Sequence, residues 1–189
     1  MNLWRAMRIQ DVDREKCMEL LGHLRLGRIA CAEAAQPYVV PFYFAYDEGY
    51  LYSFSTVGQK IRWMRANPLG CVQTDEIVSP EEWASLVILG RYEELPDTPE
   101  LKLERDLAYR LLQRKELWWE PGYSKTIVKG AERPLVPVYF RIQITQITGH
   151  HTAPEPGEGV KHTTATVEQT AKHSIRGILT DLRAKLFSK

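Results

Sequence analysis

The sequence predicts a mainly β protein, an antiparallel β-barrel with helices inserted between its strands. The strand patterns at residues 38–46 and 50–55 are neighbours joined by a short loop at residues 47–49, as in a β-hairpin. Helical patterns interrupt the strands singly, without the regular strand–helix alternation of a doubly wound sheet. The 189 residues, 44% of them hydrophobic, are enough for one core.

The strands are recognised by β-branched and aromatic residues and by alternation of apolar and polar side chains. They are expected at residues 28–32, 38–46, 50–55, 69–74, 81–95 and 136–148. The segment 81–95 is long and mostly apolar, so we expect it to cross the sheet, and Gly90 can kink it. Alternation at residues 136–148 indicates a last strand with one face in water.

Three helices are expected between these strands. Asp11 or Asp13 can cap the first helix. The second follows Gly58 and ends before Pro68, because a proline disfavours helical geometry in the residue before it. The third is expected to start with a capping box at Asp97 and to run to about residue 117.

We expect one domain over residues 1–150, a linker over 151–165 and an amphipathic helix over 166–189. Residues 153–166 are rich in Pro, Gly, Thr and Glu, which is typical of a linker. From Lys161 onward, six Lys and Arg face two acidic residues, and apolar residues recur at helical spacing. Such a tail more often packs on its own domain or on a partner subunit than on a membrane or a nucleic acid.

Composition narrows the classes of function. A formal net charge of +1 gives no overall field that would recruit nucleic acid or membrane. No apolar run reaches the roughly 20 residues of a membrane span, and the first residues lack the apolar core of a secretory signal. Three widely spaced cysteines indicate buried thiols in a reducing compartment. We therefore expect a cytoplasmic protein without membrane or nucleic-acid partners.

The four histidines near the C-terminal end do not indicate a metal site. His150, His151, His162 and His173 lie in or beside the expected linker, without cysteine or acidic partners at ligand spacing. They are interpreted as solvated side chains, and we expect no metal in this protein.

The junction between the strand at 50–55 and the following helix suits a phosphate group. The first N–H groups of a helix point outward, and the helix dipole favours an anion there. Gly58 permits close approach, Ser55 and Thr56 offer hydroxyl groups, and Lys60 supplies a positive charge. The alternative is that the hydroxyl residues only cap the helix.

Six segments resemble a known family when they are read in order. Residues 27–33, 37–44, 52–60, 67–72, 82–95 and 138–149 resemble the split-barrel FMN-binding proteins related to pyridoxamine 5'-phosphate oxidase. The nearest branch is similar to the nitroimidazole-resistance-type flavoproteins. The resemblance covers roughly residues 8–149. It implies a six-stranded antiparallel split β-barrel that forms a homodimer, with FMN held at the subunit interface.

The resemblance also assigns candidate cofactor-binding residues. Val39, Val40 and Pro41 can form a flat apolar wall for the flavin ring. The strand that runs along the flavin in this family corresponds to Tyr52, Ser53, Phe54 and Ser55. The turn that holds the phosphate corresponds to Gly58, Gln59 and Lys60. The long strand near the cofactor corresponds to Trp83 and Ser85. These assignments lower the weight of the helix-cap alternative.

The implied function is that of a flavin-dependent oxidoreductase. Electrons would come from a nicotinamide or another small donor and pass to a small-molecule acceptor. Nitroimidazole-resistance relatives often carry a histidine where this chain has Phe54, so nitro reduction is in doubt and no catalytic residue is assigned. Phe54 can equally be a core residue. Two alternatives remain open: a non-catalytic dimer that binds flavin or haem, and a structural or regulatory dimer.

Overall fold

The computed structural model describes residues 7–113, 126–128, 131–133 and 136–154. The chain divides into the units Met1–Glu155 and Pro156–Lys189, and the second unit lies outside the described residues. The helices are α1 (Arg14–His23), α2 (Gln59–Ala66) and α3 (Lys102–Gln113), the last preceded by a 3-10 turn at Pro99–Leu101. No helix among these residues is long and apolar enough to cross a membrane.

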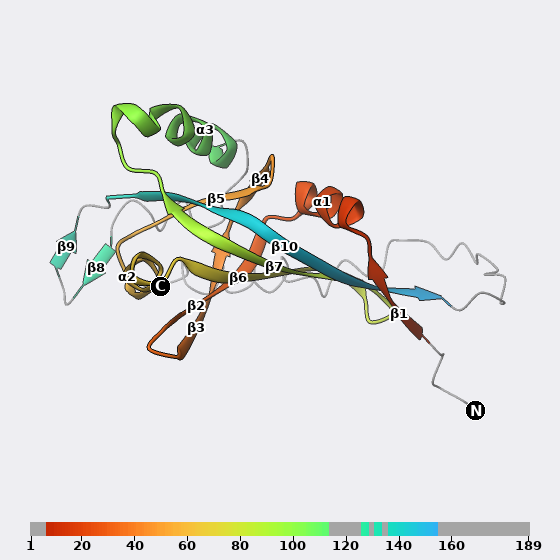
Figure 1. Ribbon diagram of the computed structural model, residues 1–189. Helices are drawn as coiled ribbons and strands as arrows, with labels where there is room; N and C mark the ends of the chain where they lie inside the picture. The colour runs from red at the N-terminus through yellow and green to blue at the C-terminus, as the bar shows by residue number, and fades with distance from the viewer. Residues whose placement is uncertain (1–6, 114–125, 129–130, 134–135, 155–189) are drawn as a thin grey trace, which may run out of the picture. The chain divides into compact units, whose positions relative to one another are not determined.

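Antiparallel strands make up most of the structure (Figure 1). They are β1 (Met7–Val12), β2 (Leu26–Glu33), β3 (Gln36–Tyr43), β4 (Ala45–Asp47), β5 (Tyr50–Ser55), β6 (Leu69–Ser79), β7 (Glu82–Glu94) and β10 (Val138–Pro154). A separate small hairpin contains β8 (Thr126–Val128) and β9 (Ala131–Arg133). The predicted mainly β class with inserted helices is therefore confirmed.

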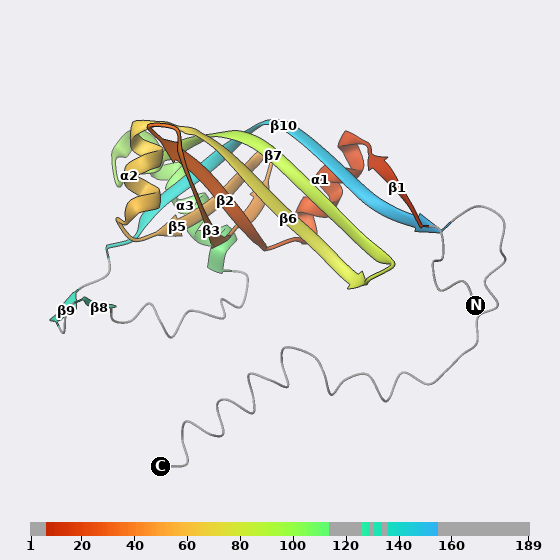
Figure 2. The ribbon, with the colours of Figure 1, turned by 90° about the horizontal axis from the view of Figure 1, so that it is seen from below.

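The main sheet turns back on itself at Phe44. Its strand order is β3-β2-β6-β7-β10-β5-β4, with β1 paired to β10, so the two strands at its ends are consecutive in the chain. Phe44 joins them, is fully buried, and donates its backbone N–H to the Arg25 carbonyl oxygen at 2.8 Å. Figure 2 shows the resulting curled sheet.

The sheet has eight strands instead of the expected six. One extra strand comes from the break at Phe44, which divides the predicted strand 38–46 into β3 and β4. The other is β1, which sequence analysis missed because Met7–Val12 does not alternate clearly. β1 pairs with the end of β10, and this backbone pairing alone specifies the strand.

β10 is the longest strand, with 17 residues. It pairs with β5 along one edge at its start, with β7 along the other edge, and with β1 at its end. Its register against β7 shifts between Ile144 and Gln146, where Thr145 donates its hydroxyl to the Leu89 carbonyl oxygen at 3.0 Å. This irregularity lies opposite Gly90, the residue expected to kink the strand.

The main core fills the inside of the curled sheet. Its fully buried members include Ile29, Phe44, Leu51, Val72, Leu86, Ile88, Phe140 and Ile142. Cys17 and Leu21 of α1 join this cluster, as do Ile61 and Met64 of α2. α3 lies on the other face of β5 and β10, where its Ala108 and Leu112 are buried in two smaller clusters.

Several predicted boundaries were right and others were wrong. Asp13 caps α1 by accepting the backbone N–H of Lys16 at 2.8 Å, and α2 ends one residue before Asn67-Pro68. The capping box at Asp97 was wrong: the residue that precedes the 3-10 turn is Thr98, which makes no capping bond. β10 extends to Pro154, so His150 and His151 belong to a strand and not to a linker. The rest of the predicted linker and the helix 166–189 lie outside the described residues.

Two tight turns contain residues with left-handed backbone. Glu48 and Gly49 have φ of 42° and 85° at the predicted hairpin loop between β4 and β5. Ala34 and Ala35 have φ of 48° and 65° between β2 and β3. Two-residue hairpins with both φ positive match the twist of the sheet, although alanine adopts this backbone at a cost.

Gly90→Ala should destabilise the protein strongly. A Cβ at Gly90 would lie 2.5 Å from Ile142 Cγ2 and 2.6 Å from the Gln143 carbonyl oxygen, so backbone has to move. We expect a loss of about 2–3 kcal/mol in the free energy of unfolding, measured by denaturant titration. Gly22→Ala is the control, since nothing lies within 4 Å of its Cβ. Equal effects of the two substitutions would contradict the close approach at Gly90.

Candidate cofactor site

The start of α2 presents backbone N–H groups that no side chain caps. The residue before the helix is Gly58, with extended backbone at φ −129°, and no side-chain capping bond is made there. The first turn contains no acidic residue. The alternative that Ser55 or Thr56 merely caps the helix was therefore wrong. Any residue can adopt the φ of Gly58, so the backbone conformation does not require a glycine there. A Cβ at this position would lie 3.9 Å from the Thr56 carbonyl oxygen and fill the space next to it.

Lys60 lies on the first turn of α2 and is turned toward the barrel. Its ammonium nitrogen is 5.8 Å from the centroid of the buried Phe140 ring. Burial lowers the pKa of Lys60, and the nearby Cys31 thiol opposes this shift. Within the described part of the chain, Lys60 has no ion-pair partner. A partly buried ammonium without a counter-ion favours an anion at this junction.

The predicted flavin wall lies on β3, which is the strand at one end of the main sheet. Pro41 is tolerated there because an edge strand needs no N–H on its outer side. Val39 (59% exposed) and Pro41 face outward, whereas Val40 is turned toward the core. Tyr38 of β3 contacts Trp63 of α2, with ring centroids 5.5 Å apart, so α2 lies against the inner face of β3, opposite to the face that carries Val39 and Pro41.

Three residues of β5 that were expected along the flavin have packed side chains. Tyr52 and Ser53 are 3% and 1% exposed, and the Ser53 hydroxyl donates to the Tyr43 carbonyl oxygen at 2.6 Å. Phe54 stacks on Tyr139, with centroids 5.6 Å apart, in the cluster that contains Leu112 of α3. Ser55 is half-buried and ends the strand, three residues before Gly58.

Trp83 and Ser85 lie far from this junction. Ser55 pairs with Val138 at the start of β10, whereas Ser85 pairs with His150, twelve residues further along the strand. At about 3.3 Å per residue the two ends are roughly 40 Å apart. The Trp83 backbone N–H donates to the Thr152 hydroxyl at 3.0 Å, and the Ser85 hydroxyl accepts from the Gln73 amide at 3.3 Å. One chain therefore does not bring all the predicted residues together.

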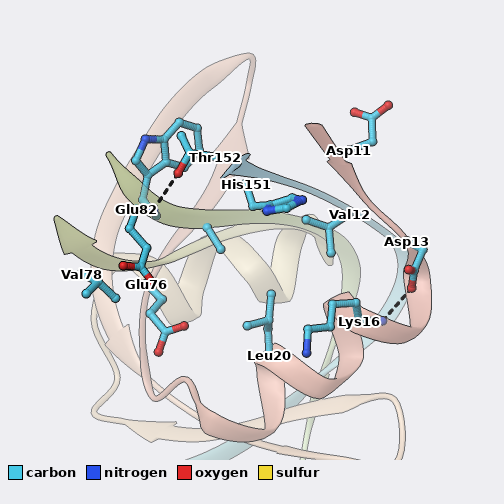
Figure 3. A pocket seen from close by; sticks show the side chains of 12 residues that line it. Asp11, Val12, Asp13, Lys16, Leu20, Glu76, Val78, Glu82, His151 and Thr152 are labelled. Atoms are coloured by element: carbon cyan, nitrogen blue, oxygen red, sulfur yellow. Dashed lines mark hydrogen bonds between the residues drawn. The ribbon is translucent and has the colours of Figure 1, made fainter. Parts of the chain in front are cut away.

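A cavity of about 450 Å³ lies at the Trp83 end of the sheet, between α1 and the hairpin of β6 and β7 (Figure 3). Its lining includes Glu76, Glu82, His151 and Leu20. Sequence analysis named His151 only as a solvated side chain and did not predict the cavity, because the predicted strand ended at residue 74 whereas β6 runs to Ser79. Among the described residues, no group of three or more His, Cys, Asp or Glu is arranged to hold a metal ion.

An ion-pair network anchors the other end of α2. The Arg65 guanidinium donates to both carboxylate oxygens of Glu94, at 2.7 Å each, and the Tyr92 hydroxyl donates to the same carboxylate at 3.0 Å. These bonds hold the pKa of Glu94 below its usual range, although partial burial opposes the shift. Burial together with the neighbouring carboxylate raises the pKa of Tyr92. The network fixes α2 on β7.

This curled antiparallel sheet with inserted helices defines a split-barrel protein. The sequence pattern of the pyridoxamine 5'-phosphate oxidase family matches residues 13–151. The chain therefore belongs to the pyridoxamine 5'-phosphate oxidase family, and the resemblance inferred from its motifs is confirmed.

Relatives support this assignment. An uncharacterized protein of Rhizobium meliloti (strain 1021) is 38% identical over 143 residues, which are 76% of this chain and 95% of the relative. A FAD-binding protein from Mesorhizobium loti is 42% identical, covers 78% of this chain and 99% of its own, and superposes with a TM-score of 0.65. A protein assigned to 5-nitroimidazole antibiotic resistance in Bacteroides thetaiotaomicron (19% identity, 78% and 89% coverage, TM-score 0.55) shares the fold.

Glu94→Gln should remove stability in a pH-dependent way. Because the pKa of Glu94 is lowered in the folded state, its contribution is present above the ordinary carboxyl pKa of about 4.3 and is lost as pH falls through the folded-state value. We expect a loss of about 1 kcal/mol at neutral pH. The loss should vanish once the carboxyl of the parent protein is protonated. The free energy of unfolding measured across acid pH checks this.

The control for that measurement is Glu33→Gln, which removes an exposed glutamate that has no ion pair among the described residues. It should change stability little at any pH. A constant difference between Glu94→Gln and the parent over the whole acid range would contradict the network.

Proposed function

We propose that the protein binds FMN at the start of α2 and is a flavin-dependent oxidoreductase. The observation that carries this proposal is Lys60, a partly buried ammonium with no counter-ion among the described residues, beside uncapped helix N–H groups. A terminal phosphate matches both the charge and the donors. The membership of the family and the FAD-binding relative at 42% identity support a flavin.

The residues present fit the rest of such a cofactor. Val39 and Pro41 offer an apolar surface on the outer face of β3, which suits a flat aromatic ring. Tyr52, Ser53 and Phe54 support this end of the barrel through packing, and their backbone pairs with β10. The bound flavin would supply the redox chemistry, taking electrons from a small donor and passing them to a small acceptor.

Phe54 bears on the catalytic part of the proposal. Its ring is stacked on Tyr139 and packed against α3, so it neither donates nor accepts a proton. The protein's role is thus to bind the flavin and control access to it. The same observation favours the second candidate, a dimer that carries flavin or haem without turnover.

We further propose a homodimer with the cofactor at the subunit interface. Trp83 and Ser85 reach a flavin at the Lys60 junction only from a second copy, because within one chain the two sites are at opposite ends of β10. The register aligns Val39, Ala30, Cys71 and Leu89 as an apolar row across the outer face of four strands. Val39 and Leu89 are 59% and 44% exposed, as is usual for a surface that another protein covers.

The polar groups beside this apolar row are already hydrogen bonded to one another. Arg28 donates to Asp75 at 3.0 Å, and the Gln73 amide donates to Asp75 at 2.8 Å and to Ser85 at 3.3 Å. Covering this face with a second copy would therefore leave few polar groups unsatisfied.

The visible absorption spectrum of the purified protein, followed by identification of the released cofactor, tests the proposal. Two flavin bands and release of FMN on denaturation would support it, and release of FAD would correct the cofactor. Oxidation of the reduced flavin by a small acceptor separates an enzyme from a carrier. A single sharp haem band would favour the second candidate. A colourless protein that does not bind added FMN would overturn the flavin proposal.

Lys60→Met should weaken FMN binding by about 10- to 100-fold, because a charged hydrogen bond to the phosphate is lost. Riboflavin, which lacks the phosphate, should bind both proteins equally. Arg62→Met is the matched control on the same helix, where Arg62 is exposed. Fluorescence titration measures the affinity of all three proteins for each of the two ligands. If Lys60→Met weakens FMN and riboflavin binding equally, Lys60 does not contact the phosphate.

Mixing Lys60→Met chains with Trp83→Ala chains tests whether the site is shared between subunits. Each homodimer should bind FMN weakly, whereas each mixed dimer should hold one site with both native residues. After unfolding and refolding together, about a quarter of the sites should regain native affinity. Binding stoichiometry at saturating protein checks this. No recovery, with each variant folded, would mean that Trp83 does not act across the interface.

A further inference from the structure

We propose that His150 is a catalytic residue of the flavin site shared between two subunits, where it gives a proton to a flat conjugated carbonyl acceptor. This inference rests on the proposed function, in which Trp83 and Ser85 approach a flavin only from a second copy of the chain. Phe54 has no proton to give, so another group has to supply it. Imidazole is the side chain that gains and loses a proton most readily near neutral pH.

The strand register places His150 beside Ser85 on the outer face of the main sheet. Ser85 pairs directly with His150 of β10 and with Asp75 of β6, and direct partners share a face. His150 also pairs with Asp11 of β1. The next residue, His151, points to the other face, where it lines the cavity shown in Figure 3. A ligand that reaches Ser85 from a second copy therefore meets His150 as well.

Asp11 orients the imidazole ring and leaves one nitrogen for a ligand. The Asp11 carboxylate lies 3.2 Å from Nε2 of His150. A protonated imidazole carries a hydrogen on both nitrogens, so Nε2 can donate to Asp11 while Nδ1 donates to an acceptor. The charged groups further along this row, Arg28 and Asp75, are paired with each other at 3.0 Å. The His150 side chain is 55% exposed, so its own chain leaves it accessible.

The next row of residues on the same face is apolar and suits a flat ring. Ile77 pairs with Trp83, and Thr152, whose hydroxyl accepts the Trp83 N–H at 3.0 Å, pairs with Ile9. Thr152 is two residues from His150, so both rows lie on one face of the sheet. Ile77 and Ile9 are 69% and 63% exposed. A conjugated carbonyl compound can rest its ring on this apolar row and direct its oxygen to His150.

The proton transfer balances when the acceptor takes two electrons. Hydride from the reduced flavin brings both electrons and one proton to the acceptor. The imidazolium N–H bond breaks as an O–H bond forms at the carbonyl oxygen, which becomes a hydroxyl group, and the imidazole regains its proton from water. An acceptor that takes single electrons without a proton, such as ferricyanide, needs no such group.

Stopped-flow oxidation of the reduced, FMN-loaded protein by two acceptors tests this role. His150→Gln should slow the reaction with duroquinone, a fully methylated benzoquinone, at least about tenfold, and leave the reaction with ferricyanide within about twofold of the parent. His23→Gln is the matched control, because His23 is exposed at the end of α1, and it should change neither rate. Equal slowing with both acceptors, or an unchanged rate with duroquinone, would overturn the inference.

The histidine NMR signals of the oxidised protein provide a second readout, which needs no turnover. Addition of FMN should shift the signal of His150, which is assigned by its loss in His150→Gln, and leave that of His23 in place. A His150 signal that does not respond to bound FMN would overturn this inference and leave the flavin proposal standing. Absence of FMN binding would overturn the flavin proposal itself, and this inference with it.

Discussion

The backbone pairing of β10 is the constraint on which the rest of the structure depends. This strand holds β7 along one edge and β5, then β1, along the other. Its start therefore supports the junction of β5 and α2, and its end supports the hairpin of β6 and β7 together with α1. Because β10 has 17 residues, its two ends support different parts of the structure.

The same constraint explains why the candidate cofactor residues separate into two groups. Lys60 is turned into the barrel at the end that α2 closes, and Val39 and Pro41 lie on the outer face of β3. The side chains of β5 contribute to packing under α3 and not to an open pocket. Trp83 and Ser85 extend a surface at the opposite end. A second copy of the chain is the simplest way in which both groups could reach one ligand.

Local signals in the sequence specified some elements well. β5 and its hairpin were predicted because Glu48 and Gly49 provide the left-handed turn, and the end of α2 because Pro68 stops a helix. The lengths of β6 and β10 could not be predicted in this way, since their outer parts are specified by pairing with distant strands. Gly58 and Lys60 could be named as candidates from their residue types and their position at the start of a helix. Their spatial separation from Trp83 could not be predicted, because it depends on the register of the strands that pair with β10.

The two prolines of β3 have a consequence for how the protein behaves when concentrated. Pro37 pairs with Ala32 and Pro41 with Arg28, so neither can donate a hydrogen bond to β2, and their ring nitrogens must face away from the sheet. Every second residue of an antiparallel edge directs its N–H outward, and here two of three successive outward positions, 37, 39 and 41, lack that hydrogen. A foreign strand would find only the Val39 N–H as a donor along this stretch. The protein thereby carries built-in resistance to edge-to-edge aggregation.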